Sequence, residues 1–231
     1  MACQTAQNRY DHETAYKVLY QSYLKSGLCA PNPWGMRIQP FHLWPETQLI
    51  CGMVDGECVA TVTLVIDEND RLPMEELFHA EVQQQRAAGR RMAELSSLAI
   101  APWFERSKTE AFAKLTSAAV QFARSQGVDQ LVATVHPRHA KLYKRLMGFE
   151  QFGSIAPHGG VLGKPAAPIA APIHDPEIVA PAWRSYYFSN SEKRNSLNRT
   201  KMTATDRRWF FQRSPGKNAQ KQSLPKRPLQ V

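Results

Sequence analysis

The 231-residue sequence contains no long hydrophobic run: no stretch approaches the roughly 18–20 consecutive apolar residues that a membrane-spanning helix needs. The N-terminus also lacks the basic segment followed by an apolar segment that marks a secretory signal. We therefore predict a cytoplasmic protein without a transmembrane segment. Apolar residues make up 43% and charged residues 21% of the chain, a composition that is typical of a globular domain and excludes collagen-like and coiled-coil chains.

Cysteine is scarce, and the sequence holds only Cys3, Cys29, Cys51 and Cys58. None of them forms a CxxC pair or has a closely spaced His, as zinc sites require. A disulfide framework is not expected in a chain of this length with so few cysteines. Walker loops and dinucleotide fingerprints are also missing. We therefore predict reduced thiols, no metal site and no bound cofactor.

Positive charge is concentrated at the C-terminal end. Residues Ala182–Val231 hold twelve of the 29 basic residues and two of the 20 acidic residues, so the rest of the chain is nearly neutral. Apolar periodicity fades in the same region, which predicts one domain over residues 1–175 and a basic, disordered tail over residues 176–231. The segment Arg207–Arg213 interleaves basic and aromatic side chains. Such a pattern can contact nucleic acid, a membrane surface or an acidic protein, and a solvated extension is the alternative.

Hydrophobic periodicity predicts alternating helices and strands before the tail. Helical spacing predicts helices over residues 10–28, 73–88, 107–125 and 137–147. Short apolar runs predict strands over residues 47–54, 58–66, 91–100, 130–135 and 149–155. The Pro-rich stretch 161–173 predicts at most one edge strand. This order favours an α/β fold, with a mixed central sheet and helices on both faces.

The order of elements resembles the N-acetyltransferase (GNAT) superfamily. The strand Leu95–Pro102 and the segment His136–Phe149, in which a Tyr precedes a Gly-Phe turn, carry this resemblance. In superfamily members that use coenzyme A, the turn after that strand is rich in Gly, and its backbone amides hold the pyrophosphate. Here the turn Pro102–Glu110 contains no Gly and two acidic residues. A tight pyrophosphate site is therefore not expected.

Several short sequence segments resemble one branch of this superfamily, the long-chain N-acyl amino acid synthases, which are related to acyl-homoserine lactone synthases. These segments are Gly35–Arg37, the hairpin Asp55–Asp67, Leu72–Phe78, Gly89–Ile100, Pro137–Tyr143 and Val161–Ala166. The resemblance covers roughly residues 15–173. It implies that acyl carrier protein donates a long-chain acyl group on phosphopantetheine to the α-amine of an amino acid. Ser97 stands where a lactone synthase would have Arg, which disfavours a homoserine lactone product.

Glu94 is the candidate general base, and its position also matches the acidic position of the resembled family. It lies on a predicted strand whose alternation places three residues on its face: Ser96, Leu98 and Ile100. A carboxylate among apolar side chains has a raised pKa, which suits it to accept a proton near neutral pH. The alternative is an ion pair between Glu94 and a basic neighbour such as Arg91.

Tyr143 and His139 are four residues apart on a predicted helix and share one of its faces. The resemblance makes Tyr143 the general acid that protonates the leaving thiolate, and a Tyr hydroxyl carries its proton at neutral pH. Core packing is the alternative for Tyr143. His139 would orient the donor or accept a proton, and the alternative is an exposed helix residue.

Three residues are candidates for substrate binding. Arg37 would bind the carboxylate of the amino-acid acceptor in a bidentate fork. Trp34 would contribute to an apolar acyl tunnel or lid, and Ser96 shares the face of Glu94. Two other functions stay open at this point: a GNAT enzyme that moves an acyl group from coenzyme A to another amine, and a non-catalytic binding module.

Overall fold

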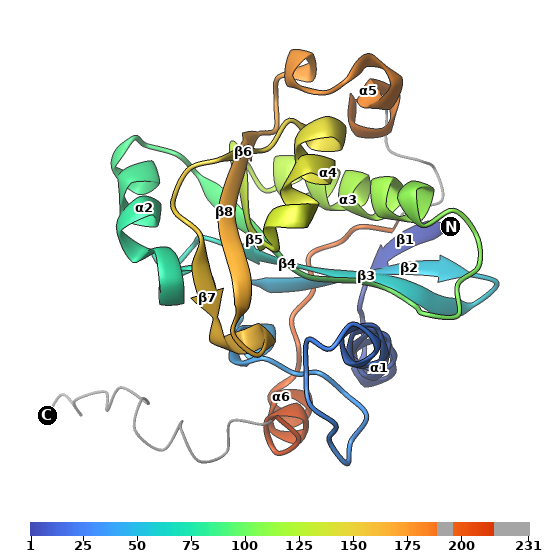
Figure 1. Ribbon diagram of the computed structural model, residues 1–231. Helices are drawn as coiled ribbons and strands as arrows, with labels where there is room; N and C mark the ends of the chain where they lie inside the picture. Colours follow the sequence, from blue (N-terminus) through green and yellow to red (C-terminus); the bar gives the residue numbers. More distant parts are fainter. Residues whose placement is uncertain (189–195, 215–231) are drawn as a thin grey trace, which may run out of the picture.

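The computed structural model describes residues 1–188 and 196–214, which form one mixed sheet of eight strands (Figure 1). The strand order is β1-β2-β3-β4-β5-β8-β6, and β7 pairs with β8 off this path. The strands are β1 (Ala2–Thr5), β2 (Thr47–Val54), β3 (Glu57–Ile66), β4 (Met92–Ile100), β5 (Gln130–Val135), β6 (Glu150–Gln151), β7 (Ala156–His158) and β8 (Lys164–Pro172).

Six α-helices accompany this sheet in the described residues. They are α1 (Arg9–Lys25), α2 (Glu75–Ala87), α3 (Lys108–Ser125), α4 (Pro137–Met147), α5 (Pro181–Phe188) and α6 (Ala204–Phe211). Figure 1 shows α3 and α4 on one side of the sheet and α1 and α6 on the other. This arrangement confirms the predicted mixed sheet with helices on both faces.

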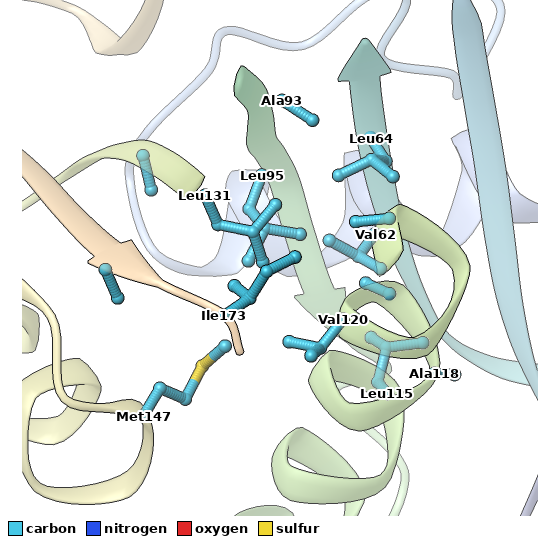
Figure 2. Packing of buried hydrophobic residues seen from close by; sticks show 14 of the residues in the cluster. Val62, Leu64, Ala93, Leu95, Leu115, Ala118, Val120, Leu131, Met147 and Ile173 are labelled. Atoms are coloured by element: carbon cyan, nitrogen blue, oxygen red, sulfur yellow. The ribbon is translucent and has the colours of Figure 1, made fainter. Parts of the chain in front are cut away.

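Each face of the sheet has its own hydrophobic core. On one face, side chains of β3, β4 and β5 such as Val62, Leu95 and Leu131 point toward α3 (Figure 2). On the other face, Leu49 of β2 packs in a cluster with Tyr16 of α1. Alternation of buried side chains along the strands supplies both cores, because successive residues of a strand point to opposite faces.

Local chemistry sets the ends of the helices next to the sheet. Side-chain oxygens of Asn8 and Ser107 accept hydrogen bonds from backbone amides in the first turns of α1 and α3. Helix α4 begins at Pro137 and ends at Gly148, which has a φ of 72°. A Cβ at Gly148 would lie 2.6 Å from the carbonyl oxygen of Ile178, so glycine is required there for space as well as for conformation.

Strands β4 and β5 form the parallel pair of the sheet, and their pairing is incomplete. The register runs from Met92 opposite Gln130 to Leu95 opposite Ala133 and then stops. Ser97 has a φ of 49°, and the register between β3 and β4 shifts at this level. A bulge of this kind bends its strand. The second half of β4 therefore leaves β5, and a gap opens within the sheet.

The bulge corrects one expectation about β4. Alternation predicted that Leu98 and Ile100 share the face of Glu94. Instead Leu98 and Ile100 pack against the core on the α3 side, whereas Val65 and Val132, the register partners of Glu94, belong to a cluster with the residues of α2. The extra residue at the bulge shifts the alternation by one.

The Pro-rich stretch 161–173 was predicted to form at most an edge strand, and this prediction is wrong. Strand β8 lies inside the sheet, with β5 on one side and β6 and β7 on the other. Proline has no N–H to donate to a neighbouring strand. The prolines of β8 are tolerated because β6 and β7 have only two and three residues, so much of that side of β8 needs no backbone N–H donor. The predicted strand 149–155 shortens to β6, and β1 has no counterpart among the predicted strands.

The described part of the tail packs on the domain, in contrast to the predicted disorder after residue 175. Tyr187 of α5 and Phe210 of α6 are buried in the two main cores. Ser196 pairs with Gln4 of β1 in a parallel bridge. Residues 189–195 and 215–231 lie outside the described residues, so the prediction of disorder is not tested there. No helix within residues 1–188 and 196–214 is long and apolar enough to cross a membrane.

Candidate active site

A cavity of about 560 Å³ lies where β4 and β5 separate. Its volume is within the range of small-molecule sites. Five of the six residues that the sequence analysis nominates line this cavity: Glu94, Ser96, Tyr143, His139 and Arg37. The fold thus brings together residues of β4, of α4 and of the loop after α1, although Arg37 and Tyr143 are more than a hundred positions apart in the chain.

Glu94 is a buried carboxylate that accepts a single hydrogen bond from the described residues. The exposed fraction of the residue is 2%, and its Oε2 accepts from the backbone N–H of Met74 at 2.7 Å. Burial raises the pKa of Glu94 to about 8, against the opposing effect of the Met74 hydrogen bond. Among the described residues Glu94 has no ion-pair partner, and Arg91 pairs with Asp129 at 2.8 Å instead. The alternative of a structural ion pair with Arg91 is therefore wrong.

Tyr143 and His139 line the cavity from α4. The Tyr143 ring is buried edge-on against Phe112 and Phe149, with centroid distances of 5.1 Å and 5.5 Å. Burial raises the pKa of the Tyr143 hydroxyl above its usual value, so the group keeps its proton at neutral pH. His139 is exposed at the cavity, and partial burial together with the neighbouring His136 lowers its pKa.

Replacing Tyr143 with Phe is expected to slow turnover while leaving the fold intact. The ring contacts would remain, and the Tyr143 hydroxyl has no hydrogen-bond partner among the described residues, so only a proton donor at the cavity is lost. General acids typically contribute on the order of 10²-fold or more in rate. Steady-state kinetics and a melting curve test this, and a large fall in the melting temperature would assign the hydroxyl to the fold.

Arg37 lines the cavity without an acidic partner in the described part of the chain. Its Nη2 donates to the carbonyl oxygen of Gly160 at 2.5 Å, and its guanidinium stacks over the Tyr23 ring at 4.6 Å. Its Nε is buried and has no hydrogen-bond partner within residues 1–188 and 196–214. A cation held in this way at a cavity is suited to bind a carboxylate. Trp34, by contrast, is not among the lining residues: it is 46% exposed and stacks under Arg213.

An apolar wall lies beside Glu94. It consists of Phe41, Trp44, Leu72, Met74 and Leu77, all of which line the cavity. An ion pair at 2.6 Å between Arg71 and the buried Glu46 places the Arg71 guanidinium 4.2 Å from the centroid of the Trp44 ring. Apolar side chains of this kind suit a hydrocarbon chain rather than a polar ligand.

The polar pair of Ser97, which lines the cavity, and His42 behind it was not predicted from the sequence. His42 lies in the short 3₁₀ helix η1 (Pro40–Leu43), and its Nε2 is 3.0 Å from Ser97 Oγ. Both residues are buried. The two are 55 positions apart, and no local signal in the sequence connects them. An aromatic-rich segment with a single His was the only indication.

The turn Pro102–Glu110 contributes no residue to the cavity lining. Ser107 Oγ accepts from the N–H of Glu110 at 3.2 Å and so occupies one amide at the start of α3. The described residues contain no group of three or more His, Cys, Asp or Glu side chains placed to hold a metal.

Comparison with known families and structures identifies the family and the fold. Residues 14–172 match the family model of the N-acyl amino acid synthase FeeM. The structure of FeeM, an N-acyl amino acid synthase from uncultured soil microbes, is 23% identical with a TM-score of 0.63, over 80% of this chain and 99% of that one. A search of curated proteins gives no match.

Two lactone synthases have the same fold. The coenzyme A-dependent acyl-homoserine lactone synthase MesI is 15% identical with a TM-score of 0.58, over 84% of this chain and 98% of that one. BjaI, another coenzyme A-dependent lactone synthase, is 12% identical with a TM-score of 0.61, over 90% and 97% of the two chains. The family match covers well over half of the sequence. The chain therefore belongs to the FeeM family of N-acyl amino acid synthases and is an acyltransferase with a GNAT-like fold.

Proposed function

We propose that the protein transfers a long-chain acyl group from acyl carrier protein to the α-amine of an amino acid. The observation that supports this proposal is the buried Glu94 carboxylate at a cavity that also has an apolar wall and the Arg37 guanidinium. Neither Glu94 nor Arg37 has an ion-pair partner in the part of the chain that the structure describes. The apolar wall suits the acyl chain, and Arg37 suits the carboxylate that every amino-acid acceptor carries.

The reaction requires two proton movements. An α-amine is mostly protonated near neutral pH, so Glu94 takes a proton from it directly or through water. The free amine attacks the thioester carbonyl carbon, the new C–N bond forms, and the C–S bond breaks. Tyr143 donates a proton to the departing thiolate, and the second proton that the nitrogen gives up restores the Tyr143 hydroxyl. The products are an N-acyl amino acid and the free thiol, with one proton released to solvent.

Two features favour acyl carrier protein over coenzyme A as the donor. The Gly-free turn Pro102–Glu110 lies outside the cavity lining and offers no pyrophosphate cradle. Helix α4, which lines the cavity with its inner face, exposes Arg138, Lys141 and Arg145, and none of these three has an acidic partner among the described residues. Acyl carrier proteins are acidic, so this basic surface at the cavity is complementary in charge.

Reversing two of these charges tests the donor. The double variant Arg138→Glu/Lys141→Glu is expected to raise KM for acyl carrier protein by roughly tenfold or more, since each exposed pair contributes up to about 1 kcal/mol. Turnover with a small acyl-pantetheine should not change. Arg90→Glu is the matched control, because Arg90 precedes β4 and lies at the other end of the parallel pair from α4.

The same assay compares the two donors directly. A lower KM for acyl-coenzyme A than for acyl carrier protein, with no effect of the double variant, would assign the protein to coenzyme A chemistry. That outcome has a precedent in the fold, since MesI and BjaI are coenzyme A-dependent enzymes. Neither donor giving product with any amino acid would reject the proposed reaction.

The cellular location follows from this proposal, whereas the contacts of the tail do not. We place the enzyme in the cytoplasm, where acyl carrier protein and free amino acids are found. A contact of the tail with nucleic acid or a membrane surface stays a prediction. In the described part of the tail, Trp209 and Phe210 are engaged in internal packing, which leaves Phe211 as the exposed aromatic residue of Arg207–Arg213.

A further inference from the structure

Ser97 lines the cavity, and the hydrogen-bonding capacity of its hydroxyl is only partly used by the described residues. The residue is 9% exposed, lines the cavity and sits on the β4 bulge with a φ of 49°. Its Oγ has one hydrogen-bond partner among the described residues, Nε2 of His42 at 3.0 Å. Which of the two atoms donates decides what Ser97 can offer to a substrate.

The backbone fixes the direction of this hydrogen bond. The N–H of Gln39 donates to Nδ1 of His42 at 3.0 Å, and a backbone N–H can only donate. Nδ1 must therefore be the bare nitrogen of a neutral imidazole, and the ring proton is on Nε2. Burial holds the pKa of the His42 imidazole well below its usual range, with smaller effects from Arg37 and His12, so the ring is neutral. Nε2–H then donates to Ser97 Oγ, and the hydroxyl proton of Ser97 has no acceptor among the described residues.

The His42 ring is held rigidly in this orientation. It stacks on Tyr16 with ring centroids 5.0 Å apart and an angle of 17° between the planes. Phe41 contacts it edge-on at 4.6 Å. A donor that is held in place before the substrate arrives costs no reorganisation during the reaction.

We propose that Ser97 Oγ–H donates a hydrogen bond to the carbonyl oxygen of the acyl thioester, and that His42 is the positioning residue that directs this proton. The inference rests on the proposed acyl transfer. The carbonyl oxygen gains negative charge when the amine attacks, and it needs a donor at that moment. Arg37 already serves the acceptor carboxylate, and Ser97 lies beyond Glu94 on the same strand, at the level where β4 has left β5.

Ser97→Gly separates the hydroxyl from the bulge. Glycine adopts a positive φ without strain, so the backbone conformation of β4 is retained, and the melting temperature should fall only by the cost of the buried Nε2–H of His42 that loses its acceptor. Turnover is expected to fall by about 10²–10³-fold, as when one oxyanion donor is removed elsewhere. A Ser97→Gly enzyme with full turnover would overturn the proposal, because it would show that only the backbone conformation matters.

His42→Asn tests the positioning role. Its amide oxygen can still accept from the N–H of Gln39, but the shorter side chain cannot reach Ser97. We expect a smaller loss in kcat than for Ser97→Gly, with KM unchanged. The double variant should lose no more than Ser97→Gly alone, because both changes remove one interaction. Additive losses would mean that His42 does not act through Ser97.

A binding experiment tests Ser97 without turnover. Two analogues of a long-chain acyl-phosphopantetheine are compared: a ketone, which keeps the carbonyl oxygen, and a thioether, which lacks it. Ser97→Gly should weaken the ketone by about 3- to 10-fold, the value of one hydrogen bond, and leave the thioether unchanged. Equal effects on both analogues, or none on the ketone, would overturn the proposal. This result holds even if the wild-type enzyme acylates no amino acid, an outcome that would reject the proposed function instead.

Discussion

Turnover is expected to fall by on the order of 10²–10⁴-fold when Glu94 is replaced with Gln, because the variant loses the general base. Gln has nearly the same size, and its amide oxygen can still accept the hydrogen bond from the N–H of Met74. It cannot accept a proton from the amine. The measurement is steady-state acyl transfer by the purified protein with a saturating donor.

The pH dependence gives this prediction a second signature. Since the pKa of Glu94 is about 8, the fraction of carboxylate and the wild-type rate should rise with pH up to about 8 and level off above it. Glu94→Gln should lose this dependence. The pKa of Glu94 is higher in the folded protein than in the unfolded chain. The free energy of unfolding is therefore lost as pH rises through the folded-state pKa of about 8, because the buried carboxyl group must then ionise. The variant carries no such charge and should not be less stable than the wild type above pH 8.

Glu76→Gln is the matched control for Glu94→Gln. Glu76 is the other carboxylate among the cavity-lining residues, and it is exposed. The loss of turnover in Glu76→Gln should be at least an order of magnitude smaller than the loss in Glu94→Gln. Equal effects of the two variants, or no effect of Glu94→Gln, would remove Glu94 from the role of base.

Phe210→Ala is expected to destabilise the protein by about 3–5 kcal/mol, the usual cost of truncating a buried Phe. Phe210 has no exposed surface, and its ring meets Tyr16 edge-on at 5.2 Å and His12 at 6.0 Å. An ion pair at 2.5 Å between Arg9 and Asp206 joins α6 to α1 at the surface. Helix α6 lies outside the matched family segment and still completes one face of the domain.

Phe211→Ala is the control for this stability change. Phe211 is the next residue of α6 and is 38% exposed. An exposed truncation of this kind usually changes stability by less than about 0.5 kcal/mol. Chemical denaturation of both variants is the measurement. If the two variants have the same stability, α6 does not pack on α1 as described here.

Much of this fold could be predicted from periodicity, because most elements are long and amphipathic. The bounds of β2 and β5 agree with the prediction to the residue, and α3 differs by one position at its start. Strand β1 has only four residues, which is too short for a periodic signal. The tail was predicted as disordered because its composition is polar, whereas its helices pack on the domain with two buried rings, Tyr187 and Phe210.

The candidate site could be predicted in part. Glu94 could be named because its place on a predicted strand is visible in the sequence, and the family resemblance supported it together with Tyr143. Arg37 could be named because its guanidinium suits a carboxylate. The bulge at Ser97 could not, since a positive φ at Ser leaves no mark in the pattern of apolar residues. The contact between His42 and Ser97 depends on the folded chain, and so does the position of Trp34 outside the cavity.

Mass spectrometry of lipids tests the central claim most directly. Lipids are extracted from cells that express the wild-type protein and from cells that express Glu94→Gln at the same level. The account predicts new long-chain N-acyl amino acids with the wild type and at most a trace with the variant, and their masses identify the acceptor and the acyl chain lengths. No new N-acyl amino acid with folded wild-type protein, or the same species in equal amounts from both, would contradict it.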